Sequence, residues 1–196
     1  MRLLYSLGLL YLVLCAVLLW TGGARMDPAP VPVARPTHPM VAPPPGNAAE
    51  WFGAIKPYCN AVEVETRLKY QTPPAGLEGA GYAAACLALA GKIDKARERI
   101  TALSAPERAS AAGIVFEIGH PVADAGDDKS AGPIMELVVE FIPNHYMALY
   151  HAGASEFILG QSALAREHLT SFLQYYHEQD GWRNSALDML KKLGPQ

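Results

Sequence analysis

Small residues recur along this chain with a period of 34 or 35 residues, and that period constrains the fold more than any other feature. Gly91, Gly126 and Gly160 are each followed five residues later by an alanine and preceded seven residues earlier by a small residue. The alanines are Ala96, Ala131 and Ala165, and the earlier small residues are Ala84, Gly119 and Gly153. Large apolar residues follow each alanine after four and seven positions, namely Ile100, Met135, Leu169, Leu103, Val138 and Phe172. Such a period predicts stacked helical hairpins.

The spacing has a packing explanation. Two antiparallel helices approach closely only where neither carries a bulky side chain, so the small residue of the first helix is expected to face that of the second. The glycine between them is expected to end the first helix, because only glycine adopts the left-handed conformation without a steric cost. Residues 181–193 have apolar side chains at helical spacing and a polar opposite face, and we expect them to cap the array.

The expected helices cover most of the chain after residue 46. They are residues 47–70 with a break at Pro57, then 78–90, 93–103, 107–118, 132–141, 145–159, 162–176 and 181–193. Asp94 and Ser162 stand where second helices begin and are expected to cap them. Pro121 is expected to kink or end the first helix of the second hairpin.

This pattern resembles the tetratricopeptide repeat, a family of 34-residue helix–turn–helix units, over residues 77–177. Pro143 stands at the family's terminal proline in the second unit, whereas Arg108 and His177 take that position in the first and third. The aromatic residue typical of the first helices is replaced by Leu87, Val122 and Glu156. The resemblance implies an all-α fold, a right-handed superhelical array of antiparallel helix pairs, with a non-repeat helical bundle as the alternative.

Members of this family mostly act as adaptors that hold a peptide or partner helix in the concave groove of the first helices. The resemblance places six side chains of this chain in such a groove: Phe116, His120, Asp124, Met147, Tyr150 and Phe157. Their apolar character suits a hydrophobic peptide or helix. Taken singly, Phe116, Met147 and Phe157 each fit the core better than a groove. Self-association of the repeats is a further alternative.

The N-terminus carries a long apolar segment. Residues 3–20 form an almost unbroken apolar run between Arg2 and Arg25, longer than the roughly 7–15 residues of a signal-peptide core and long enough to span a membrane. Residues 1–25 therefore predict a membrane anchor, with the folded part outside the cytoplasm, on the periplasmic side of a bacterial membrane. Cleavage near Ala24, which would release a secreted protein, is the alternative.

A proline-rich segment follows at residues 26–46. It contains eight prolines, which favour an extended polyproline conformation over helix or sheet. We interpret it as a semi-rigid linker between the anchor and a folded domain at residues 47–196.

Charge and motif content exclude several classes of function. Of 16 basic residues, Arg2 and Arg25 precede the linker, which leaves 14 against 19 acidic residues, a formal balance of −5. No basic cluster suits nucleic acid. The chain shows no nucleophile–base pair, phosphate-binding loop or known metal spacing, so it predicts a scaffold without catalytic residues, cofactor or metal. The oligomeric state is left open.

The segment from His120 to Ser130 supplies the competing hypothesis, a metal-binding protein or hydrolase. Asp127, Asp128 and Ser130 suit a helix N-terminus, where carboxylates oppose the dipole and accept hydrogen bonds from free N–H groups. A hard cation bound by Asp124, Asp127 and Asp128 is an alternative. A second is a zinc site formed by His120, Asp124 and His145, although no known ligand spacing supports it.

Two cysteines lie in the predicted domain. Cys59 and Cys86 both fall within expected helices, and Cys86 lies in a run of small residues typical of a packed face. A disulfide would be chemically allowed in an exported domain. The sequence nevertheless favours two buried thiols, because free cysteines are among the most buried residue types.

Overall fold

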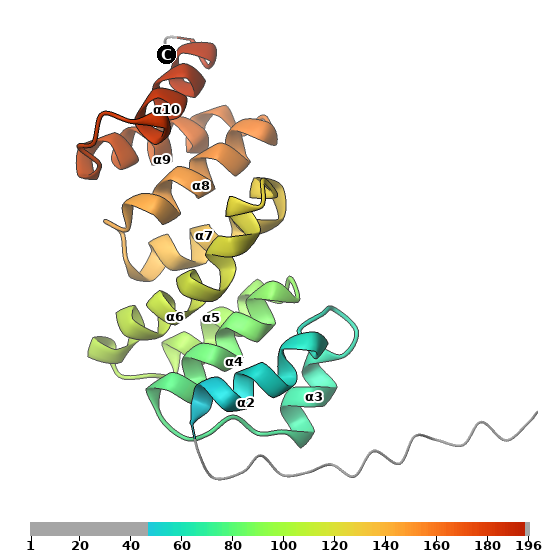
Figure 1. Ribbon diagram of the computed structural model, residues 1–196. Helices are drawn as coiled ribbons and strands as arrows, with labels where there is room; N and C mark the ends of the chain where they lie inside the picture. The colour runs from blue at the N-terminus through green and yellow to red at the C-terminus, as the bar shows by residue number, and fades with distance from the viewer. Residues whose placement is uncertain (1–46, 195–196) are drawn as a thin grey trace, which may run out of the picture. The chain divides into compact units, whose positions relative to one another are not determined.

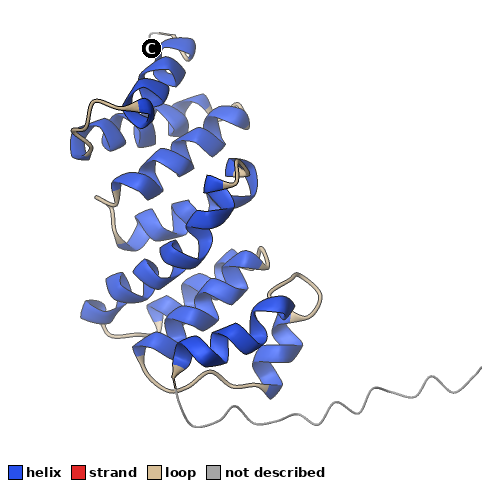
Figure 2. Ribbon diagram, viewed as in Figure 1, coloured by secondary structure: helices blue, strands red, loops and turns tan. Residues whose placement is uncertain are grey.

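The computed structural model describes residues 47–194, and every regular element within that range is helical (Figure 2). The elements are α2 (Ala48–Ile55), the 3-10 helix η1 (Lys56–Tyr58), α3 (Val64–Tyr70), α4 (Leu77–Leu89), α5 (Ile93–Thr101), α6 (Ala105–Asp124), α7 (Asp128–Phe141), α8 (Tyr146–Ile158), α9 (Ser162–Tyr175) and α10 (Gly181–Lys192). The all-α class is thereby confirmed for this part of the chain. The expected anchor and proline-rich linker lie outside the described residues.

Three helix pairs are closed by the same turn. Gly91, Gly126 and Gly160 have φ values of 71°, 85° and 73°, in the left-handed region that favours glycine. Each glycine N–H donates to the carbonyl three residues earlier, and the next N–H donates to the carbonyl five residues earlier, as from Lys92 to Leu87 at 2.9 Å. This is the Schellman arrangement. The predicted role of the three glycines is confirmed.

The helices pack on one another in chain order (Figure 1). Helix α4 contacts α5 and α6, and α6, α7, α8 and α9 each contact the next helix in the series. Helices α2 and α3 cover α4 at one end, while α10 packs on α8 and α9 at the other. On the inner side of α10, Ala186 and Met189 are buried. Residues 181–192 therefore end the described array, as expected.

The small residues of the first helices allow close helix approach, as expected. The residue that each glycine faces on the second helix, however, is a large one and not the small one that was expected. A Cβ added to Gly153 would lie 2.7 Å from Cγ of Leu169, and one added to Gly119 would lie 2.7 Å from Cγ2 of Ile134. Leu169 stands one turn after Ala165 on the second helix of its pair. The space left by a glycine on the first helix is thus filled by a large side chain of the second.

Helix α6 continues through Pro121 and ends at Asp124. The expected helix end at residue 118 is therefore wrong, and of the two outcomes expected at Pro121, a kink or an end, the end does not occur. Proline removes one N–H donor, but its own carbonyl still accepts from Ala125 N–H at 3.1 Å, so the ladder resumes beyond it. The additional turn places Asp124 on the same helix as His120.

The caps of the second helices differ among the three pairs. Helices α5 and α9 begin after Lys92 and Gln161 without a side-chain capping bond, so the predicted caps at Asp94 and Ser162 are wrong. In α5 and α9 the N-cap position is occupied by the residue that directly follows the turn glycine, Lys92 or Gln161. In α7 the cap is present, because Asp127 Oδ1 accepts from Ser130 N–H at 3.1 Å.

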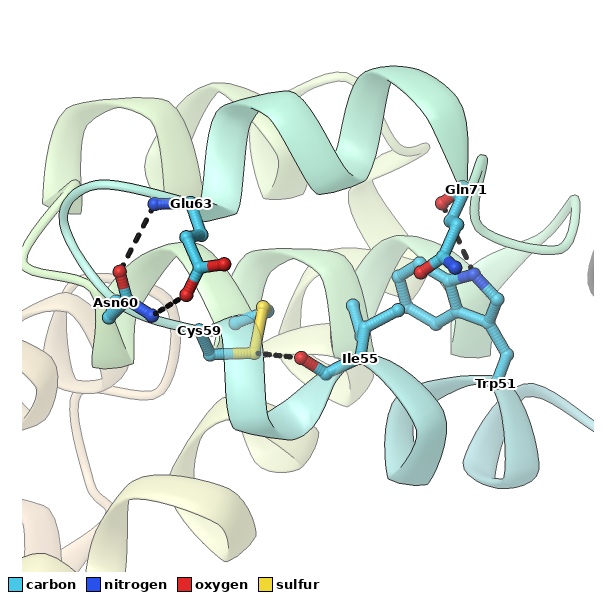
Figure 3. Close-up of a disulfide and its surroundings, with 7 residues drawn as sticks. Trp51, Ile55, Cys59, Asn60, Glu63 and Gln71 are labelled. Atoms are coloured by element: carbon cyan, nitrogen blue, oxygen red, sulfur yellow. Dashed lines mark hydrogen bonds between the residues drawn. A yellow bond between two sulfur atoms is a disulfide. The ribbon is translucent and has the colours of Figure 1, made fainter. Parts of the chain in front are cut away.

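Cys59 and Cys86 form a disulfide, with their Cα atoms 4.8 Å apart, so the expectation of two buried thiols is wrong. Cys59 lies after η1 and not within a helix, which leaves its side chain free to meet α4. Figure 3 shows how the following loop is held: Asn60 Nδ2 donates to Glu63 Oε2 at 2.9 Å. The bridge ties the N-terminal helices to the first hairpin.

The described part of the chain contains no helix that is both long and apolar enough to cross a membrane. The segment expected to do so, residues 3–20, lies outside it.

Candidate functional site

Among residues 47–194, a group of histidine and aspartate side chains lies where the last turn of α6 meets α8. His120 and Asp124 are four residues apart on α6 and therefore lie on one face. The Gly126 turn then starts α7, with Asp128 in its first turn. His151 comes from the middle of α8. Three successive helices thus supply the group, and we refer to these four residues as the His/Asp cluster.

His151 is held from one side of its ring. Its side chain is only 2% exposed, and Nδ1 lies 2.8 Å from Asp128 Oδ1. A carboxylate can only accept a hydrogen bond, so Nδ1 carries the proton in this contact. In the neutral ring Nε2 then presents a lone pair.

The free nitrogens of both histidines point to one carboxylate. Nε2 of His120 lies 3.4 Å from Asp124 Oδ1, and Nε2 of His151 lies 4.0 Å from the same atom. Both nitrogens are buried and have no hydrogen-bond partner among the described residues. One ligand atom from each of the three residues lies within 4.8 Å of the other two.

Aromatic rings enclose the His/Asp cluster. His120 stacks on Phe116 with ring centroids 4.6 Å apart. His151 contacts Tyr150 on its own helix and Trp182 of α10, at centroid distances of 5.2 and 5.6 Å. The hydroxyl of Tyr150 donates to Ser185 at 2.9 Å, which attaches α10 to α8 at this point.

The six residues predicted for the groove divide into two groups. Phe116, 8% exposed, stacks on His120, and Tyr150, 7% exposed, contacts His151. The side chain of Asp124 is 48% exposed. Met147 and Phe157 instead pack against the apolar side chains of two separate core clusters. The structure thus brings four of the six residues around the His/Asp cluster.

His145, which the zinc hypothesis included, has another role. Its Nδ1 accepts from Ala148 N–H at 3.3 Å and caps α8. Burial lowers the pKa of His145 below its usual value. His151 takes its place beside His120 and Asp124. The sequence offered little signal for this, since His151 lies among small and apolar residues and meets α6 only through the packing of the helices.

Rings with exposed surface adjoin the His/Asp cluster. Tyr146 and Trp182 are 44% and 37% exposed. Tyr146 lies 5.3 Å from Tyr176 between ring centroids, and Trp182 lies 4.9 Å from Tyr150. The hydroxyl of Tyr176 donates to Asp180, and this bond raises the pKa of Tyr176 to about 12. The start of α8, the end of α9 and the start of α10 therefore share one aromatic surface.

A second histidine–carboxylate pair lies between α8 and α9. Glu156 is fully buried, and both of its carboxylate oxygens lie 2.9 Å from Nδ1 of His168. The hydrogen bond to Glu156 raises the pKa of His168, while burial and the charge of Glu156 raise the pKa of Glu136. Sequence reasoning noted only that Glu156 replaces a typical aromatic residue and missed its partner twelve residues away.

Comparison with family models, with curated proteins and with solved structures finds no match to this chain.

Proposed function

We propose that this protein is a scaffold of the tetratricopeptide-repeat type that holds a protein or peptide partner and is tethered to a membrane, or exported, through residues 3–20. The identical glycine turns of three successive hairpins, 35 and 34 residues apart, support the repeat assignment. The apolar length of residues 3–20 supports the tether. The scaffold itself carries out no reaction.

The observation that carries the partner-binding proposal is an aromatic surface on α6, α8, α9 and α10. We call it the aromatic face and define it by Phe116, His145, Tyr146, Tyr150, Tyr176 and Trp182. Its rings are linked by contacts of 4.0 Å between Phe116 and His145, 5.3 Å between Tyr146 and Tyr176, and 4.9 Å between Tyr150 and Trp182. Tyrosine and tryptophan dominate the binding energy of many protein interfaces, because they bury a large area and keep a polar tip.

The chemistry of the aromatic face suggests the chemistry of its partner. Trp182 offers a partly exposed ring on the buried Tyr150, and Tyr146 offers one on the less exposed Tyr176, which suits an apolar side chain of a peptide or helix. The half-exposed carboxylate of Asp124 lies at the edge, and the region after Arg25 carries an excess of five negative charges. We therefore expect a partner segment that combines apolar residues with a basic one.

The test is affinity capture by the full-length chain from detergent-solubilised membranes of the source cells. The double variant Tyr146→Ala/Trp182→Ala is expected to lose a protein that the wild type retains. Tyr70→Ala is the matched control, because Tyr70 is 51% exposed on α3, outside the aromatic face. Binding of the captured protein is then measured as a dissociation constant with purified components. Equal affinity for the wild type and the double variant would refute the proposal.

A further inference from the structure

We propose that His120, Asp124 and His151 form a binding site for one divalent transition-metal ion, with zinc as the preferred ion and Asp128 as the residue that orients His151. The proposal does not rest on partner binding at the aromatic face, although Tyr150 and Trp182 of that face contact the His151 ring.

The first argument is the arrangement of acceptors. Asp128 holds the proton of His151 on Nδ1, at 2.8 Å, so the buried Nε2 presents a lone pair. That lone pair faces the Asp124 carboxylate, itself an acceptor, at 4.0 Å. His120 Nε2 is also buried, is without a partner among residues 47–194, and approaches the same oxygen at 3.4 Å. The two facing acceptors, His151 Nε2 and Asp124 Oδ1, are stabilised by a cation between them, and His120 Nε2 adds a third ligand atom when its ring proton is on Nδ1.

The second argument is distance. Zinc binds imidazole nitrogen and carboxylate oxygen at about 2.0–2.2 Å in tetrahedral geometry, which places the ligand atoms about 3.3 Å from one another. The 3.4 Å between His120 Nε2 and Asp124 Oδ1 already has this spacing. Rotation of the half-exposed Asp124 side chain can shorten its 4.0 Å distance to His151. The two imidazoles, whose ligand atoms lie within 4.8 Å of each other, must approach by a small movement of the His120 ring, which is 24% exposed.

The third argument is the environment of His151. Histidine ligands usually donate their second ring N–H to a carboxylate, which sets the tautomer and strengthens the ligand. The contact between His151 and Asp128 supplies this partner from a different helix. The rings of Tyr150 and Trp182 enclose the same imidazole and keep it in place.

The donor set indicates the class of ion. Two imidazoles with one carboxylate suit zinc and neighbouring transition metals, whereas calcium and magnesium prefer sites composed of oxygen ligands. Three protein ligands leave a fourth tetrahedral position for water or for a donor from another molecule. Asp124, the most exposed of the three, places that position toward solvent.

The alternative to a metal ion in the His/Asp cluster is a second proton on His151. A doubly protonated His151 would donate to Asp128 from Nδ1 and face Asp124 through Nε2–H. In that state the cluster would be an internal ion pair that needs no metal. The two states differ in a property that is directly measurable, namely the uptake of one metal ion per chain.

The experiment is a titration of the chelator-treated full-length protein with zinc, followed by calorimetry and by elemental analysis after desalting. We expect one tightly bound equivalent of zinc and no comparable binding of Mg²⁺ or Ca²⁺. With Co²⁺ in place of zinc, we expect the visible absorption bands of a low-symmetry metal site. Asp124→Asn and His120→Ala are expected to abolish detectable binding. Asp128→Asn, which removes the orienting charge, should weaken binding about 10- to 100-fold.

Two variants serve as controls. His145→Asn can still cap α8 and should bind zinc as the wild type does, because His145 is not a ligand. His177→Ala removes an exposed histidine and controls for adventitious surface binding. Helical circular dichroism tests whether Asp124→Asn remains folded, as we expect for a near-isosteric change at a half-exposed position. Absence of a tight equivalent in the wild type, or full binding in folded Asp124→Asn, would overturn the proposal.

Discussion

Within residues 47–194 a histidine pairs with a carboxylate of another helix in two places, and the two places differ in how completely they satisfy their polar atoms. Between α8 and α9, His168 Nδ1 lies 2.9 Å from both oxygens of the fully buried Glu156. Between α6 and α8, His151 bonds to Asp128 through one nitrogen, while its other nitrogen and that of His120 lack partners within the described residues. The first pair is self-contained, and the second is incomplete without a further group.

This difference separates a structural role from a binding role. A buried ion pair whose atoms satisfy each other holds two helices in register, and removal of one member leaves an uncompensated charge. A buried polar group left without a protein partner costs stability unless a water, an ion or another ligand pairs with it. Burial alone would not have distinguished the two, since His151 and Glu156 are both almost completely excluded from solvent.

The largest expected effect is at the self-contained pair. His168→Ala should lower the free energy of unfolding by about 3–5 kcal/mol, because it leaves the buried Glu156 carboxylate without its partner. Urea denaturation of the full-length protein, followed by helical circular dichroism, measures this change. The exposed His177→Ala should change stability by no more than about 0.5 kcal/mol. Equal effects of the two substitutions would remove the distinction between the sites.

Zinc bound at the His/Asp cluster should stabilise the folded wild-type protein. At a free zinc concentration 100 times the dissociation constant, linkage predicts an increase of about 2.7 kcal/mol in the free energy of unfolding. Asp124→Asn should show no such increase, whereas His168→Ala should retain it, because His168 lies outside the His/Asp cluster. The readout is the shift in denaturation midpoint with added zinc. A shift of equal size in Asp124→Asn would place the stabilising ion elsewhere.

The pH dependence of stability tests the self-contained pair without a mutation. The raised pKa of His168 means that the folded chain holds this proton more tightly than the unfolded chain does. Its stabilisation is therefore complete below the ordinary histidine value of 6.5 and is lost as the pH rises through the folded-state pKa. The neutral ring can still donate from Nδ1, so the loss should be only about 1 kcal/mol, the difference between a charge-assisted and a neutral hydrogen bond.

Denaturation curves between pH 7 and 9 measure this loss, with Glu156→Gln as the comparison. Burial lowers the pKa of His145 from the ordinary histidine value of 6.5, so His145 contributes little in that window. Wild-type stability should fall across the window, and the variant should lose less. A flat wild-type profile would contradict the charge-assisted bond.

The smallest effect is expected at Asp124 in the metal-free protein. Asp124→Asn should leave the free energy of unfolding within about 0.5 kcal/mol of the wild type, because this side chain is 48% exposed and receives no hydrogen bond from a described residue. The same substitution is predicted to abolish zinc binding. A large loss of stability without metal would show that Asp124 supports the fold and would weaken its assignment as a ligand.

The fold could be predicted well because its determinants are local. The glycines at 91, 126 and 160 end helices through their own backbone conformation, and the apolar period selects the buried face of each helix. The errors also have local causes. Pro121 does not end α6, because one missing N–H does not stop the helix from resuming. Cys59 lies in a loop and not in a helix, and a boundary error of that size was enough to reverse the disulfide prediction.

The candidate site was less predictable because its members are distant in the sequence. His120 and Asp124 were recognised together, since four residues along one helix bring them to one face. The zinc hypothesis from the sequence names His145, the nearer histidine, as their third partner, but His145 caps α8 and His151 is the histidine that joins His120 and Asp124. These two histidines are six positions apart in the sequence, and only the register between α6 and α8 decides which of them meets Asp124.

The sequence by itself thus determined the helical class, the hairpin period and the positions of the three turns, because each depends on a residue's own backbone preference or on the apolar pattern of one helix. The tertiary structure decided which histidine joins Asp124, that Glu156 pairs with His168, and that Cys59 meets Cys86. Those pairings depend on how one helix is rotated and shifted against the next. Side-chain packing across the interface sets that register, and no single segment encodes it.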